Sequence, residues 1–273
     1  TDCFQVAREV FSRTKRMDVG SAVMSILASG GPIAQAERVG SFLALHGMDP
    51  DEERKLHIGF SAGRFEFMAR PYGIVPRDAV EEAAWPALRG QIFSEASEIF
   101  LRLLNGEVVS SESVPATTLK RENFRTDEDW GEVQRVAVRQ DGLEAPPESI
   151  EIGNRYVFED IKTIPQDWRR DLLNLVIGSH DPNLQEKVNR FRPVQVFNLS
   201  ITPPHVIEDT HERMSRDYHK DGGDWSRRMM PRTIMVFLND EDGLTREQQD
   251  EAAMEEARSA LSTYWSALEG TID

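Results

Sequence analysis

The sequence has little cysteine, no long apolar run and a deficit of positive charge, and each absence excludes a class of protein. Its one cysteine, Cys3, cannot form an internal disulfide. No stretch of about 18 apolar residues occurs, so no membrane-spanning helix is predicted. Acidic residues outnumber basic ones 47 to 32, which gives a net charge of -15. Because this charge repels a phosphate backbone, we expect no nucleic-acid partner.

Other absent motifs narrow the chemistry. Residues 1–5 lack the basic start and apolar core of a secretory signal, so we expect a cytoplasmic location. No glycine-rich nicotinamide fingerprint follows a predicted strand. His205, Glu208 and His211 lie on a predicted helix, but no fourth ligand accompanies them. We interpret them as a solvated helix face and predict no metal site.

Predicted strands and helices alternate along the chain. Its 273 residues, 39% of them hydrophobic, can bury a substantial core. Strands are predicted at 19–24, 56–60, 172–177, 194–201 and 233–238, and helices at 78–104, 182–190 and 246–268, with two more that begin at Pro32 and Pro204. Successive strand–helix–strand units require a parallel sheet with right-handed crossovers. The residues therefore predict an α/β fold, either a barrel or an open doubly wound sheet.

Residues 107–166 interrupt this alternation. They are rich in charge and contain the breaker Ala145-Pro146-Pro147. We interpret them as an irregular insertion, which is either a lid or oligomer arm or a solvated excursion.

The segment after the predicted strand at 56–60 is a candidate ligand site. Ser61, Ala62 and Gly63 are small, so a flat or phosphorylated ligand can approach the backbone closely. Arg64 then offers a positive charge for an anion or a carboxylate. The alternative interpretation of this segment is a tight turn.

A second candidate follows the predicted strand at 172–177. Gly178 and Ser179 precede a helix that Asp181 can cap. Backbone N–H groups at a helix start, with the positive end of the helix dipole, suit a phosphate. His180 is either a ligand contact or a capping or surface residue.

Taken in order, several segments resemble the luciferase-like flavin-dependent monooxygenase superfamily, which includes deazaflavin F420-dependent oxidoreductases. The segments that carry the resemblance are 12–23, Pro32 with 36–39, 58–64, 72–73, 95–99, 104–107, 158–165 and 175–179. Their succession, rather than any single one, is specific. The resemblance implies one (β/α)8 TIM barrel domain over 1–273, incomplete in the residues given because only its third to seventh strands are visible. In such a barrel the flavin lies across the C-terminal ends of the strands.

The resemblance also implies positions for the cofactor. Ala22 and Val23 fall where the family often has a non-prolyl cis peptide behind the flavin, although an ordinary strand end fits equally well. The other matched residues are Ser61, Ala62 and Gly63 in a loop that contacts the cofactor, and Gly178 and Ser179, beside His180, in the loop that binds its phosphate. Arg64 stands where F420-dependent sugar-phosphate dehydrogenases of the family carry an acidic glutamate, which favours FMN.

The function implied by the resemblance is a flavin-dependent monooxygenase that uses reduced FMN and molecular oxygen on a small organic substrate. A separate flavin reductase is the implied partner, and a homodimer the implied assembly. The alternatives are an F420-dependent oxidoreductase and a non-catalytic barrel that binds a flavin or another phosphorylated ligand. No general acid or base occupies the matched positions, so no catalytic residue is predicted.

Overall fold

The computed structural model describes residues 2–20, 23–63 and 68–268, with the backbone alone over 263–268. The chain divides into two compact units. The larger is Thr1–Phe197 with Pro204–Pro231, and the smaller is Asn198–Pro203 with Arg232–Asp273. A single barrel domain over the whole chain stays a prediction.

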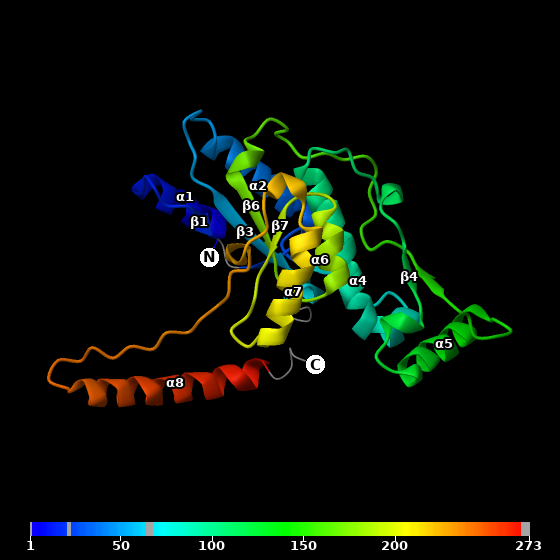
Figure 1. The fold of residues 1–273 in the computed structure, drawn as a ribbon. Coiled ribbons are helices and arrows are strands. Elements are labelled where there is room, and N and C mark those ends of the chain that lie inside the picture. The colour runs from blue at the N-terminus through cyan, green and yellow to red at the C-terminus, as the bar shows by residue number, and fades with distance from the viewer. Residues whose placement is uncertain (1, 21–22, 64–67, 269–273) are drawn as a thin grey trace. The chain divides into compact units, whose positions relative to one another are not determined.

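A parallel sheet forms the centre of the larger unit (Figure 1). Its strands are β1 (Val19–Gly20), β2 (Met24–Ser25), β3 (Leu56–Ser61), β6 (Leu173–Ile177) and β7 (Val194–Val196). The order is β1-β3-β6-β7, with β2 also paired to β3, and every pair is parallel. The predicted α/β fold with a parallel sheet is therefore confirmed. Within the part of the chain that the structure describes, no further strand closes this sheet into a barrel.

The register divides the sheet into an apolar face and a mixed face. Alternate residues of a strand point to opposite faces. Ile58 lies opposite Leu175 on one face, and His57 lies opposite Asn174 on the other. The apolar face belongs to the core and carries Leu56, Ile58, Phe60, Leu173, Leu175, Ile177, Val194 and Val196.

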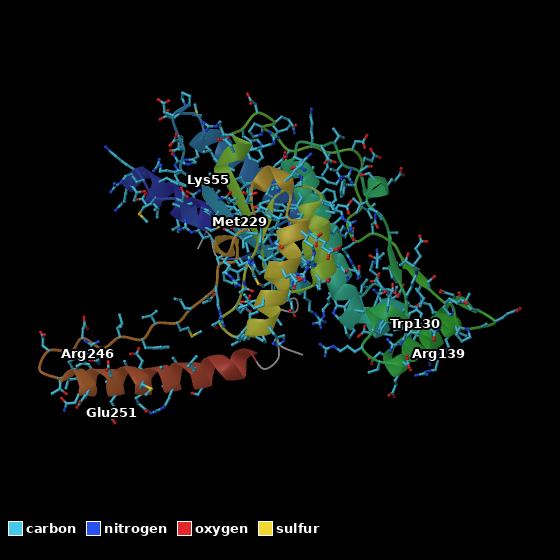
Figure 2. All side chains as sticks on the ribbon, viewed as in Figure 1. Lys55, Trp130, Arg139, Met229, Arg246 and Glu251 are labelled. Carbon is cyan, nitrogen blue, oxygen red and sulfur yellow. The ribbon has the colours of Figure 1, made fainter. Side chains whose placement is uncertain are left out.

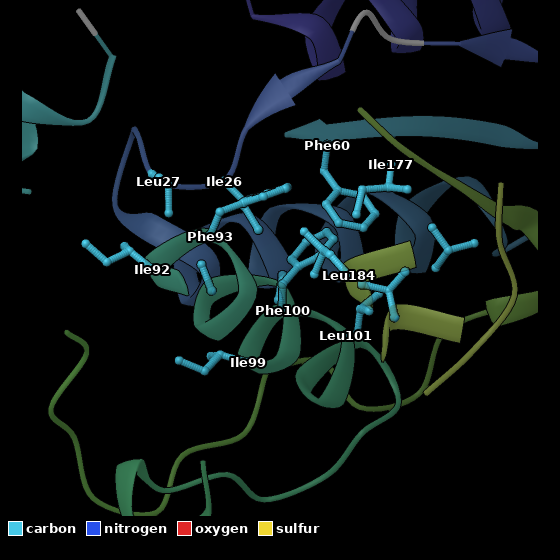
Figure 3. Close-up of a cluster of buried hydrophobic side chains, with 14 of the residues drawn as sticks. Ile26, Leu27, Phe60, Ile92, Phe93, Ile99, Phe100, Leu101, Ile177 and Leu184 are labelled. Atoms are coloured by element: carbon cyan, nitrogen blue, oxygen red, sulfur yellow. The ribbon is translucent and has the colours of Figure 1, made fainter. Parts of the chain in front are cut away.

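Helices α2 (Gly31–His46) and α4 (Ala79–Leu104) pack against each other in the core. Figure 3 shows Phe60 and Ile177 of the sheet directed towards Phe100 of α4. The rings of Phe60 and Phe100 lie 5.5 Å apart, and both residues are fully buried. Burial of each such side chain stabilises the fold by about 1.5–3 kcal/mol. This packing holds β3 and β6 against α4.

The other α-helices that the structure describes in the larger unit are α1 (Cys3–Arg13), α5 (Asp127–Asp141), α6 (Pro182–Asn189) and α7 (Pro204–Asp217). The predicted insertion at 107–166 contains α5 and a two-stranded antiparallel sheet of β4 (Thr117–Leu119) and β5 (Ile150–Ile152). Trp130, labelled on α5 in Figure 2, is buried against Phe124. The insertion is thus more regular than its sequence suggests. None of the described helices is both long enough and apolar enough to cross a membrane.

Two predictions for the C-terminal part are wrong. Residues 233–238 form no strand, and Ile234, Val236 and Leu238 are 75%, 68% and 80% exposed. Arg232, just before this segment, forms a parallel bridge to Asn198. An extended segment becomes a strand only where a neighbouring strand satisfies its backbone hydrogen bonds, and the described residues provide none for 233–238. Helix α8 (Arg246–Leu268) forms as predicted. Helical spacing puts Leu261 on an apolar stripe with Ala253 and Ala257 and predicts that it is buried, but Leu261 is 41% exposed.

Candidate functional site

The carboxyl ends of β2, β3 and β6 bring together most of the described residues of the predicted cofactor site. Ser25 of β2 lies opposite Ser61 of β3, and its Oγ donates to the carbonyl of Ala62 at 2.8 Å. Gly63 N–H donates to Ser61 Oγ at 3.0 Å. Gly178, after β6, donates its N–H to the carbonyl of Phe60 at 2.8 Å. Two segments far apart in the sequence therefore meet at one edge.

Val23 packs over this edge. A Cβ added at Gly178 would lie 2.8 Å from Val23 Cγ1 and 3.2 Å from Ser61 Cβ. A Cβ added at Gly59 would lie 2.9 Å from Val23 Cα. A side chain at position 59 or 178 would therefore force Val23 to move.

The predicted phosphate loop already uses several of its donors. The Gly178 N–H is engaged in the sheet, and Ser179 Oγ accepts a hydrogen bond from Asp181 N–H at 3.2 Å. The Asp181 carboxylate caps α6 by accepting from Asn183 N–H at 2.9 Å. A carboxylate thus occupies the helix start, where sequence analysis places a phosphate. The Ser179 hydroxyl keeps its proton for donation to a ligand.

The other predicted positions fall into two groups. Ala22 and Arg64 lie outside the described residues. His180 is exposed beside Ser179. The role of His180 as a ligand contact stays a prediction.

The mixed face of the sheet is hollowed beside this edge, a feature that sequence analysis missed. The cavity measures about 370 Å³, within the range of small-molecule sites. Its lining residues are Gly20, Val23, His57, Gly59, Val176, Gln195, Phe197, Arg228 and Pro231. Apolar walls with a few polar groups suit a flat ring that carries hydrogen-bonding atoms.

His57 is held in place at the wall of this hollow. Its Nδ1 accepts from the Asn174 side-chain amide at 3.3 Å, so Nε2 carries the proton and donates to Asp18 Oδ2 at 3.4 Å. Burial raises the pKa of the Asp18 carboxyl, but hydrogen bonds from Lys55 N–H and His57 outweigh burial and lower it. Both ring nitrogens of His57 are engaged, so the imidazole acts as a fixed wall.

Two of the three residues considered for a metal, Glu208 and His211, have other partners in the structure. Glu208 forms an ion pair with Arg227, and His211 Nδ1 accepts from Trp225 Nε1 at 2.9 Å. These contacts hold the segment that carries Arg228 against α7.

A known monooxygenase shares this fold. It is the monooxygenase RslO1 from Streptomyces bottropensis, whose crystal structure is similar over 100% of this chain with a TM-score of 0.58 and 17% sequence identity. The chain spans 64% of the length of that protein. No protein-family model matches the sequence, and no curated protein sequence matches it. At this identity the likeness establishes the fold alone.

Proposed function

We propose that this chain forms the flavin site of a luciferase-like monooxygenase that uses reduced FMN and molecular oxygen on a small organic substrate. One observation carries the proposal: Val23 lines the hollow of the mixed face and also packs against Gly178 at the carboxyl edge. Through Val23, the cavity adjoins the edge that carries the two predicted ligand segments. The fold shared with a monooxygenase supports the same activity.

The residues of the hollow fit a flavin ring. Val23, Val176 and Phe197 would exclude water from its faces, and the amide of Gln195 would orient it by hydrogen bonding. Arg228 would place a positive charge beside the ring, where charge tunes a flavin. The Ser179 hydroxyl would bind the phosphate. When bound, the flavin would supply the activation of oxygen that these side chains cannot perform.

The finer structural statements belong to the same proposal. The five described parallel strands would form part of a (β/α)8 barrel, whose active site lies at the carboxyl ends of its strands. A separate reductase would supply reduced FMN, and the assembly would be a homodimer.

A variant that fills the hollow tests the proposal. Val176→Phe adds volume to the cavity wall, whereas Val157→Phe makes the same change at a side chain that is 84% exposed. We expect Val176→Phe to weaken FMN binding, measured by flavin fluorescence and calorimetry, by about 10-fold or more, which corresponds to 1.4 kcal/mol. Val157→Phe should bind FMN as the unmodified chain does.

The same assay separates the alternatives. Oxygen uptake with reduced FMN and a panel of small organic substrates would support monooxygenase chemistry. Binding of F420 in place of FMN would replace the proposal with an F420-dependent oxidoreductase. FMN binding without turnover would point to a non-catalytic flavin-binding protein, and failure to bind either flavin would reject the proposal.

A further inference from the structure

A second hollow lies at the opposite, amino-terminal edge of the sheet. It measures about 700 Å³ and is lined by Lys55 before β3, Leu173 at the start of β6 and Pro193 before β7. Lys55 and Met229, both labelled in Figure 2, belong to its wall. Five residues of β6, at about 3.3 Å each, separate this edge from the carboxyl edge. We call this hollow the basic cleft.

Two guanidinium groups give the basic cleft its charge. Arg192 lines it, and the Nε and Nη1 atoms of Arg192 are buried without a hydrogen-bond partner among the described residues. Arg170 lines it too, and donates to the carbonyls of Leu104 at 3.0 Å and Gln166 at 3.2 Å. Carbonyl oxygens satisfy hydrogen bonds but do not neutralise a full positive charge. Burial and the neighbouring Arg170 lower the pKa of Arg192 to about 10.

The carboxylates in the wall do not offset these charges. Asp171 is paired with Arg169 at 2.7 Å. The side chain of Asp221 is 72% exposed and lies 3.8 Å from His219 Nδ1. In a chain with a net charge of -15, the described residues thus leave two arginines side by side without a carboxylate partner. An uncompensated buried cation is unfavourable unless an anion joins it.

We propose that the basic cleft binds the phosphoryl group of a small phosphorylated molecule. Guanidinium groups match the planar pairs of oxygens on a phosphate, and two of them with Lys55 complement a doubly charged anion. The basic cleft is larger than the hollow of the mixed face and has room for the rest of such a molecule. The inference stands on the cleft alone and does not require the proposed flavin chemistry.

Titration with inorganic phosphate and pyrophosphate, against sodium chloride at equal ionic strength, tests this site. We expect calorimetric binding to the unmodified chain and a loss of affinity of about 10-fold or more in Arg192→Gln. Arg139→Gln is the control, because it removes the same charge from an exposed side chain of α5 (Figure 2). The exposed Lys55→Gln should also weaken binding, which provides a second variant if Arg192→Gln fails to fold.

Two sets of results would overturn the proposal, and a third result would support it and identify the ligand. The first is no saturable binding of phosphate or pyrophosphate to the unmodified chain. The second is a loss of phosphate affinity that is as large in the control variant Arg139→Gln as in Lys55→Gln. Binding of succinate as tight as that of phosphate would overturn the proposal in the same way. The third concerns Gln195, which lines both hollows. If Arg192→Gln weakened FMN binding but not riboflavin binding, the basic cleft would hold the phosphate of the flavin itself.

Discussion

Val23 determines which side chains positions 59 and 178 can hold. An alanine at 178 would place its Cβ 2.8 Å from Val23 Cγ1, closer than such atoms pack. We predict that Gly178→Ala lowers the free energy of unfolding by about 1–3 kcal/mol, as overpacking does, and weakens FMN binding because Val23 must move. Urea titration and flavin fluorescence measure the two effects.

Gly90 offers a matched control for this substitution. A Cβ at Gly90, inside α4, meets no atom within 4 Å. Gly90→Ala should therefore raise the free energy of unfolding by up to about 1 kcal/mol, because alanine favours a helix interior, and should leave FMN binding unchanged. If Gly178→Ala matched the unmodified chain in both measurements, Val23 would not constrain the site.

Part of the site can be predicted from single residues, and part cannot. Small residues after a strand, such as Ser61 and Gly178, are a local signal, and the structure places them at one edge. The polar residues His57, Asn174 and Gln195 were missed because they lie inside strands. A parallel strand that is buried on both faces is apolar along its whole length. Each of these strands instead contains a polar residue, and this was the sequence signal that one face of the sheet is not packed.

Among the elements, helices with local start signals were predicted well. Asp78 accepts from Glu81 N–H at the start of α4, and Asp181 caps α6. The helix α5 was missed although Thr126 accepts from Asp129 N–H at its start, a recognisable cap. For residues 233–238 a strand was predicted that does not form. Their apolar and β-branched composition favours a strand, but a strand also needs a neighbouring strand to pair with.

The cap of α6 leads to a prediction about the phosphate loop. The Asp181 N–H donates to Ser179 Oγ, and the Asp181 carboxylate, at the start of α6, would repel a phosphate bound by Ser179. Asn caps a helix as well as Asp does, so Asp181→Asn removes the charge and keeps the helix. We predict FMN binding about 2- to 5-fold tighter in Asp181→Asn, from the 0.3–1 kcal/mol typical of a charge at a helix end. Fluorescence titration measures the change.

Riboflavin, which lacks the phosphate, is the control ligand for this variant. Its affinity should be the same for Asp181→Asn and the unmodified chain. Equal tightening of FMN and riboflavin would show that the effect does not act through a phosphate. Unchanged affinity for both would place the phosphate away from Ser179.

At the scale of the whole molecule, the sequence predicts a parallel sheet but not its closure. Strand order follows from the alternation of strands and helices, and the order β1-β3-β6-β7 has the parallel pairing that was expected. Closure of a barrel requires consistent strand number, tilt and stagger, which depend on all strands together. No motif in a single segment carries that information.

The stability of the whole molecule in acid should depend on one ion pair. Arg54 donates to the carbonyls of Phe11 at 2.9 Å and Thr14 at 2.7 Å, and it pairs with Glu52, whose side chain is 10% exposed. The pair thus ties the end of α1 to the segment before β3. The hydrogen bond from Arg54 outweighs burial and lowers the pKa of Glu52 from 4.5 to about 2.

Because the folded-state pKa of Glu52 is depressed, its stabilising contribution is complete above pH 4.5 and disappears as the pH falls towards 2. At 1.36 kcal/mol per pKa unit, reduced by solvent screening of an ion pair near the surface, we predict that Glu52→Gln lowers the free energy of unfolding by about 1–3 kcal/mol at pH 7. Urea titrations at pH 7, 4.5 and 3 should show this difference shrink as the pH falls. Glu251→Gln, at an exposed position of α8, should change stability little at any of these pH values. A difference for Glu52→Gln that stayed constant between pH 7 and 3 would mean that the loss reflects packing around the side chain and not its charge.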